Sequence, residues 1–384
     1  MSQFSVEVVR IAKIEKNPNA DSLSITEALG NPVQFRTPDY GVGSKAVYVP
    51  IDSMVPVNRP EFAFLANKDK PKEYERIKAK KLRGVFSCGL LLPVPARPEW
   101  QQKISRLTLG FLYAPYDVGD DLAEVLGVKK FEEEEDDEPD TSTSLSRLYR
   151  KWKWKLFGKK SSGPKEPRGR VSDKGPFPHY EIENVRRYKE ALIEGEQVVI
   201  FEKLHGCQFR AGWVDGEWKI ASHRRYRNPD DTNPTNHWGS VARSLKLKER
   251  LDAFKDHVVY GEVFGVSETG KPIQDLTYGA TEPTLKIFDV YFIPSRRWFN
   301  ADEIIEFANS IGIGTPPVLY RGDWKGVDYH APTLETKSKL CPANIMEGGV
   351  IRPVLERSEL KLGRVVLKLV TQNYLLRKGG SEKH

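Results

Sequence analysis

Cysteine is scarce in this chain, with only three among 384 residues. Cys88, Cys207 and Cys341 lie far apart and show no paired spacing, which excludes both a disulfide framework and a cysteine-based zinc site. A chain without paired cysteines fits a reducing compartment. We therefore expect an intracellular protein, either cytoplasmic or nuclear.

Long apolar runs are also missing. No stretch approaches the roughly 18 apolar residues that a membrane-spanning helix needs. The first residues, 1–7, lack a basic segment followed by an apolar core, so no secretory signal is visible. These absences predict a protein without a membrane partner.

The bulk composition is that of a folded protein with a polar surface. The length of 384 residues fits two or three domains, and the hydrophobic content of 39% is enough for packed cores. The formal net charge of +7 favours polyanionic partners, although net charge alone is weak support for any one of them.

Residues 1–127 are predicted to be rich in β-strands, because short apolar runs alternate with turn signals such as Asn17-Pro18-Asn19. This pattern indicates a small barrel or sandwich. The later segment 77–91 places Lys80, Lys81 and Arg83 just before a strand. Such cations either protect an exposed strand edge or contact nucleic acid, and the sequence leaves both readings open.

Residues 128–175 differ sharply in composition. An acidic block at 132–138 predicts a solvated, partly disordered insertion. Residues 145–156 then place apolar side chains on one face of a predicted helix whose other positions are mostly basic. That helix could dock on a domain, pair with the acidic block, bind nucleic acid or bind an anionic membrane surface.

Residues 176–384 show a mixed α and β pattern, with predicted helices at 242–251 and 301–308. The apolar run 198–201 predicts a buried strand that carries Lys203 to its polar end. Lys368 likewise emerges from an apolar run, and a buried ammonium needs an anion or an exit to solvent. Glu262 and Glu347 lie beside glycines, and Glu347 offers the hard oxygen ligands that suit Mg²⁺.

Taken in order, these segments resemble the motifs of the covalent nucleotidyltransferases, the superfamily of RNA ligases, DNA ligases and mRNA capping enzymes. The resemblance covers about 198–372 and rests on the ordered set Lys203-x-His-Gly206, Ser222 followed by arginine, Glu262-x-x-Gly265, Phe288-Asp289, Glu347-Gly-Gly-Val-Ile and Lys368. Histidine inside the lysine motif is more similar to RNA ligases than to DNA ligases.

The order of domains narrows the resemblance to ATP-dependent RNA ligases with an N-terminal OB domain. The chain ends soon after Lys368, which leaves no room for the C-terminal OB domain of DNA ligases and capping enzymes. The segments 17–23 and 81–87 resemble the N-terminal OB domain of that RNA ligase class. The implied fold is α+β: an OB-like barrel in 1–127, a charged linker in 128–175, and an adenylyltransferase domain with ATP-grasp-like antiparallel sheets in 176–384.

The resemblance also implies roles for individual residues. Lys203 would carry AMP and Lys368 would assist it, while Glu347 would hold Mg²⁺ or Mn²⁺. The residues implied to bind ATP are Glu202, Gly206, Gln208, Arg224, Glu262, Phe288 and Lys368. The implied partner is RNA or an RNA/DNA nicked duplex, bound by a monomer.

Two positions depart from that class. Its second motif V lysine is replaced by Val370, and an asparagine after the motif I glycine is replaced by Gln208. Val370 favours one alternative, a non-catalytic nucleic-acid-binding protein that retains the fold. The other alternative is a GTP-dependent mRNA capping guanylyltransferase, against which the missing C-terminal OB domain argues.

Overall fold

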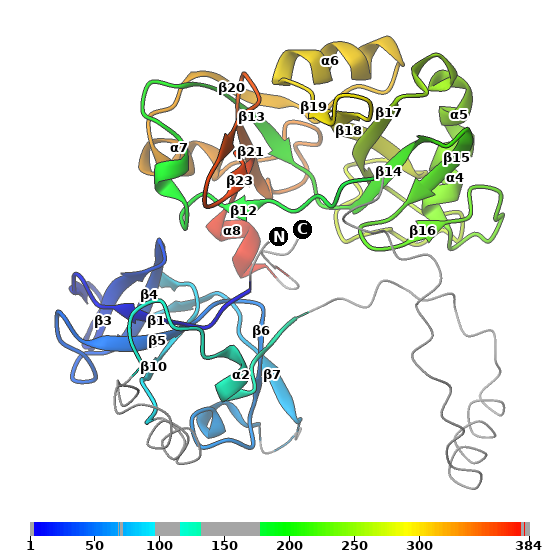
Figure 1. Cartoon of the computed structure of the whole chain (residues 1–384). Helices are drawn as coiled ribbons and strands as arrows, with labels where there is room; N and C mark the ends of the chain where they lie inside the picture. Colours follow the sequence, from blue (N-terminus) through cyan, green and yellow to red (C-terminus); the bar gives the residue numbers. More distant parts are fainter. Residues whose placement is uncertain are drawn as a thin grey trace, which may run out of the picture. The chain divides into compact units, whose positions relative to one another are not determined.

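The computed structural model describes residues 4–67, 69, 72–96, 116–131, 177–377 and 380. The described residues form two compact units: the first combines 4–131 with 181–203 and 318–380, and the second combines 177–180 with 204–317 (Figure 1). The predicted acidic block and the predicted helix 145–156 lie outside the described residues, and the limits 1–127, 128–175 and 176–384 stay a prediction.

Short antiparallel strands make up the N-terminal part of the first unit, as the turn signals predict. Two three-stranded sheets are ordered β1-β5-β10 and β2-β3-β4, a third is ordered β11-β6-β7, and β8 pairs with β9. The elements are β1 (Glu7–Arg10), β2 (Glu15–Asn17), β3 (Ala20–Ala28), β4 (Asn31–Arg36), β5 (Lys45–Val49), β6 (Ser53–Pro56), η1 (Ala63–Leu65), β7 (Tyr74–Arg76), β8 (Lys80–Leu82), β9 (Val85–Ser87), β10 (Leu90–Pro93), α2 (Ala123–Leu126) and β11 (Lys129–Lys130).

The first unit also contains a five-stranded sheet in the order β12-β24-β21-β13-β20, whose pairings are antiparallel except for β12 with β24. Alternate residues of its strands pack with helix α7 into one apolar core. The elements are β12 (Glu183–Asn184), η2 (Lys189–Ala191), β13 (Gln197–Lys203), β20 (Val318–Asp323), α7 (Val327–Leu334), β21 (Gly348–Pro353), β22 (Ser358–Glu359), β23 (Gly363–Arg364), β24 (Leu367–Val370) and α8 (Gln372–Leu376).

The second unit is built on a six-stranded antiparallel sheet in the order β16-β15-β14-β17-β18-β19. Helices α4, α5 and α6 pack on one face of this sheet, which leaves its other face to polar and aromatic side chains. The elements are β14 (Cys207–Val214), β15 (Glu217–Ala221), β16 (Tyr226–Arg227), α4 (His237–Ser244), α5 (Leu247–Arg250), η3 (Asp252–Phe254), β17 (His257–Phe264), β18 (Thr284–Phe292), β19 (Arg297–Trp298) and α6 (Ala301–Ser310).

The structure confirms one of the two predicted helices and divides the other. The segment 301–308 is confirmed within α6, where Asn300 and Glu303 form a capping box. The segment 242–251 is not one helix, because Lys246 adopts a left-handed conformation with φ +50° and separates α4 from α5. Apolar periodicity alone does not reveal such a break.

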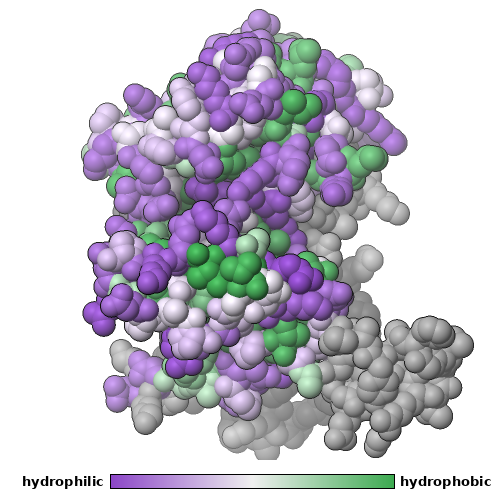
Figure 2. All heavy atoms as spheres, turned by 90° about the vertical axis from the view of Figure 1, so that its left-hand side faces the viewer, coloured by the Kyte–Doolittle hydropathy of each residue, from purple (hydrophilic) through white to green (hydrophobic). Residues whose placement is uncertain are grey.

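The mixed α+β class is confirmed, with strands dominating and helices few. Figure 2 shows a face that is mostly hydrophilic, with hydrophobic side chains gathered in small patches. Among the described residues, no helix combines the length and the apolar character that crossing a membrane requires.

Candidate active site

Lys203 ends strand β13 and forms a buried ion pair with Glu347. The Nζ atom lies 2.6 Å from Oε1, and the side chains are 5% and 0% exposed. Lys203 pairs with Gly348, the first residue of β21, so Glu347 directly precedes the neighbouring strand at the level of Lys203. A Cβ atom at Gly348 would meet the Leu369 carbonyl oxygen at 2.1 Å, so only glycine fits there. The close packing of β21 on β24 therefore depends on glycine directly after Glu347.

The pKa of Glu347 is raised above its ordinary value of 4.5, because complete burial disfavours the charged carboxylate. Lys203, Lys368 and Arg377 act in the opposite direction. The ionised form of Glu347 therefore depends on nearby positive charge. A divalent cation would stabilise this form more than the single charge of an ammonium group does.

Lys368 lies on the same sheet face as Lys203. It pairs with Val350, which in turn pairs with Phe201, and side chains directly opposite one another share a face. Val370 follows on the same face two residues later and is buried. The structure therefore aligns the two predicted lysines and adds an apolar side chain beside them.

Glu202 points to the opposite face of β13. Its Oε2 atom accepts hydrogen bonds from the backbone N–H groups of Lys339 and Leu340, at 2.8 and 3.2 Å. Its Oε1 atom is buried without a hydrogen-bond partner among the described residues. The carboxylate therefore anchors the loop before Glu347 and retains one acceptor oxygen.

In the second unit, Gly206 and Glu262 are joined directly. The backbone N–H of Gly206 donates to Glu262 Oε1 at 3.0 Å. A Cβ atom at Gly206 would lie 2.3 Å from the Val263 carbonyl oxygen, so this close approach requires glycine. The next residue but one, Gln208, pairs with Glu262 across strands β14 and β17. Three of the predicted nucleotide-binding residues therefore meet on one sheet.

Phe288 lies where the pairing of β17 with β18 shifts register. Tyr260 pairs with Asp289 but Gly261 pairs with Ile287, so Phe288 is the extra residue of a β-bulge. Its ring centroid lies 5.0 Å from that of Tyr180. The bulge therefore sends Phe288 to the face opposite the helices, next to an aromatic side chain.

Arg224 lies in the tight turn between β15 and β16. The Ser222 N–H donates to the Arg225 carbonyl oxygen at 2.8 Å, which closes the turn. Arg224 is partly exposed and Arg225 is exposed. The turn presents both guanidinium groups on the surface of the second unit.

Arg210 is the residue that the sequence patterns missed. It is completely buried, and Nη2 donates to Gln208 Oε1 at 3.0 Å. Gln208 Nε2 donates in turn to the Tyr180 carbonyl oxygen at 3.1 Å. Gln208 is thus held in a polar network. The sequence offers one signal that could have revealed Arg210: a charged arginine lies between the apolar residues Phe209 and Ala211.

The basic segment of the N-terminal part forms the β8–β9 hairpin, with Arg83 and Gly84 both at positive φ in its turn. Lys80, Lys81 and Arg83 are exposed. Asn19 Nδ2 donates to the Arg83 carbonyl oxygen at 2.8 Å, which holds the tip of the hairpin.

Comparison with known proteins finds two family models that match parts of the chain. Residues 196–370 match the RNA ligase family model, and residues 5–94 match an OB-fold domain model. No curated protein matches the chain in sequence.

Among solved structures, similar ones include Naegleria gruberi RNA ligase with PPi, at TM-score 0.69 and 19% identity, covering 97% of both chains. A mutant of that ligase with ATP and Mn has TM-score 0.71 and 19% identity, again covering 97% of both chains. Another mutant, with AMP and Mn, has TM-score 0.69 and 19% identity over 96% of this chain and 97% of that chain. Residues 196–370 are therefore similar to the RNA ligase family and residues 5–94 to an OB-fold domain, and the chain shares its fold with these solved structures.

Proposed function

We propose that the chain is an ATP-dependent RNA ligase that joins a 3′-hydroxyl to a 5′-phosphate, in nicked RNA or RNA/DNA duplexes, through a lysyl-AMP intermediate. The observation that carries this proposal is the buried Lys203–Glu347 pair inside the RNA ligase domain. The similarity to solved RNA ligase structures with ATP, AMP and Mn supports the choice of nucleotide and metal.

The first step forms a bond between Lys203 Nζ and the α-phosphorus of ATP and breaks the bond to the bridging oxygen, so that pyrophosphate leaves. The attacking amine must be neutral, and a lysine at its ordinary pKa of about 10.4 is mostly protonated at neutral pH. Because Lys203 Nζ lies 2.6 Å from Glu347 Oε1, Lys203 would have to leave this contact before it attacks.

The first unit offers one carboxylate ligand for a divalent cation. Glu347 supplies a hard carboxylate ligand, and its burial beside Lys203 puts that ligand next to the attacking atom. When bound, Mg²⁺ or Mn²⁺ would neutralise charge on the phosphate oxygens. Lys368, on the same face as Lys203, would add positive charge for the phosphates.

The remaining residues would position the nucleotide. The buried Oε1 of Glu202 is an acceptor suited to the exocyclic amine of adenine, and Phe288 offers a ring face for stacking. Glu262 would accept a hydrogen bond from a ribose hydroxyl, and Arg224 would bind a phosphate group. Gly206 allows the backbone to approach closely, and Gln208 supports that segment through Tyr180 and Arg210.

In the second step AMP moves from Lys203 to the 5′-phosphate of the RNA. In the third step the 3′-hydroxyl attacks that phosphate, the phosphodiester bond forms and AMP leaves. The N-terminal OB-fold domain, with its exposed Lys80, Lys81 and Arg83, would hold the polyanionic strand.

The decisive experiment incubates the protein with Mg²⁺ and ATP or GTP labelled at the α-phosphate. Label should attach from ATP, should be absent in Lys203→Ala, and should persist in the exposed control Lys361→Ala. Attachment from GTP alone would indicate a capping guanylyltransferase, and no attachment from either would indicate a non-catalytic binder. Nicks with RNA or DNA on each side then define the acceptor, and sedimentation tests the expected monomer.

A further inference from the structure

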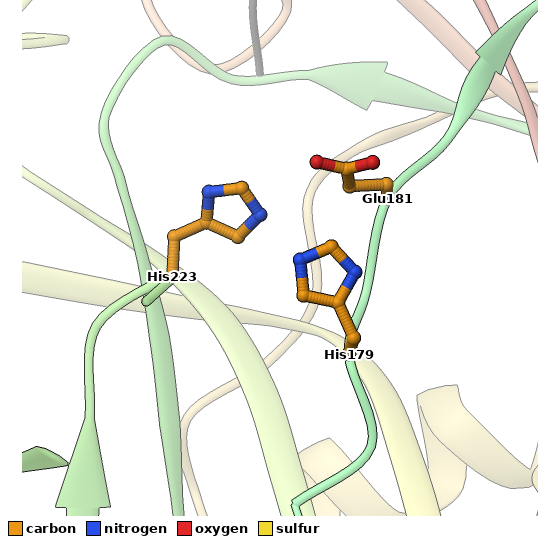
Figure 3. Close-up of side chains that lie close together, drawn as sticks. All are labelled: His179, Glu181 and His223. Atoms are coloured by element: carbon orange, nitrogen blue, oxygen red, sulfur yellow. The ribbon is translucent and has the colours of Figure 1, made fainter. Parts of the chain in front are cut away.

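Two histidine rings face each other on the second unit, and none of the roles proposed above uses them. The centroids of His179 and His223 are 5.1 Å apart, and the ring planes differ by 30°. Glu181 follows His179 by two residues, so the chain itself keeps its carboxylate near. One ligand atom from each of the three lies within 4.8 Å of the others, and all three residues are partly exposed (Figure 3).

A buried arginine fixes the backbones that carry the two histidines. Arg210 Nη1 donates to the carbonyl oxygens of Phe177 and Pro178 at 3.4 and 3.3 Å, and Nη2 donates to that of His223 at 2.7 Å. The Tyr260 hydroxyl also donates to Pro178 at 2.7 Å. The spacing of the rings is thus set by groups in the interior of the unit rather than by flexible surface segments.

We propose that His179, Glu181 and His223 form a binding site for a divalent transition metal of the Zn²⁺ type. Two imidazoles and one carboxylate are a three-ligand set that leaves coordination positions open to water. Imidazole favours Zn²⁺, Co²⁺ or Ni²⁺, whereas Mg²⁺ prefers a shell of oxygen ligands. The ligand chemistry therefore distinguishes this site from the one assigned to Glu347.

Occupancy would have a local consequence. His223 belongs to the Ser222–Arg225 turn, and His179 belongs to the segment before β12, so a shared metal would cross-link the two. Since Arg224 follows His223, the metal would also limit the motion of the predicted phosphate ligand. This last consequence rests on the proposed function, but the binding of metal does not.

The test uses the full chain stripped of metal and titrated with Co²⁺, whose visible absorption reports imidazole coordination, and with Zn²⁺ by calorimetry. One equivalent should bind, and Zn²⁺ should raise the melting temperature. His179→Gln and His223→Gln should each weaken binding by at least about tenfold, and Glu181→Gln should weaken it less. The matched controls, His237→Gln and Glu183→Gln, should bind as the unchanged chain does.

Two results would overturn the proposal. One is the absence of saturable binding, which would make the cluster an ion pair of imidazole and carboxylate only. The other is binding that survives both histidine substitutions, which would place the metal elsewhere. Lys203→Ala separates this proposal from the ligase: it should keep the Co²⁺ absorption while losing the label from ATP.

Discussion

At the scale of single residues, the most informative contact is the ion pair between Lys203 and Glu347. Both side chains are almost fully buried, and removing one partner of a buried pair leaves an uncompensated charge that is costly. A buried ion pair of this kind adds little to the stability of the folded protein, so a functional role explains its presence better. Under the proposed function, the pair would hold the attacking amine and the metal ligand in adjacent positions before any nucleotide binds.

Replacing Glu347 with Gln should lower metal-dependent labelling from ATP by at least about 100-fold, because the preorganised charge beside the phosphate is lost. Glu347→Asp should retain more activity, and the exposed control Glu194→Gln should retain all of it. In the unchanged protein, labelling should fall with acid at a pH above 4.5, because burial raises the pKa of Glu347 and its protonation removes the ligand. Equal labelling by Glu347→Gln and Glu194→Gln would contradict the assignment.

A second prediction concerns the replacement of Val370 with lysine. It lies on the Lys368 face at the place where the resemblance to RNA ligases implies another lysine. Val370→Lys should speed nick sealing about tenfold, since a hydrogen bond to a charged group is worth roughly 1.5–3 kcal/mol. It should also lower the melting temperature without nucleotide, because the position is buried. The control Val370→Met has a long side chain like that of lysine but no charge. Equal rates of nick sealing by both variants would refute the idea that a positive charge at position 370 speeds sealing.

At the scale of elements, the strands explain which residues were predictable. The strand positions of Lys203 and Glu262 were predictable because each residue lies in an apolar strand, and strand alternation fixes their faces. The Phe288 bulge was not visible, because an extra residue breaks the period of two that the prediction depends on. Nor could the break at Lys246 be found, since it depends on one backbone angle rather than on the apolar pattern.

Strand β17 begins with His257, whose ring stacks on Phe307 with centroids 5.3 Å apart. Burial lowers the pKa of His257 below 6.5, although Asp256 and the Phe254 backbone oppose this. The unfolded chain therefore takes up the proton first, so the stability that His257 contributes is present above pH 6.5 and is lost as pH falls below it.

His257→Phe and His257→Gln should both flatten the loss of stability below pH 6.5, because neither side chain titrates. Only His257→Phe should keep the packing on Phe307, so it should be the more stable of the two at pH 8. Denaturant unfolding between pH 5 and pH 8 measures both effects. An acid dependence that is unchanged in both variants would show that His257 does not titrate across folding.

At the scale of the whole molecule, the ordered motifs predicted the similarity of residues 196–370 to RNA ligases, and the turn signals predicted the strand-rich N-terminal part. Arg210 escaped prediction because its partners are backbone carbonyl groups, at Phe177, Pro178 and His223, that no sequence spacing connects. The His179–His223 pair escaped for the same reason, since 44 positions separate two histidines that the fold brings face to face.

The two proposed activities should be separable, because AMP attachment would use the residues of 196–370 whereas strand binding would use the OB-fold domain as well. Replacing Lys80, Lys81 and Arg83 together with Gln should leave labelling from ATP unchanged and weaken binding to nicked RNA duplex. Each lost phosphate contact lowers the slope of log affinity against log salt by roughly 0.9, so the slope should fall by roughly 2 to 3.

A triple Gln variant at Arg10, Lys13 and Lys72 removes the same charge from exposed positions of the same domain. If net charge alone attracted RNA, both variants would lose affinity equally. A larger loss in the hairpin variant requires a local contact, which the polar contacts of Asn17, Asn19 and Gln34 would preorganise by holding the β8–β9 backbone. Affinities for nicked duplex are measured across a salt series, together with AMP attachment. They decide whether the β8–β9 hairpin is a solvated sheet edge or binds the nucleic-acid strand.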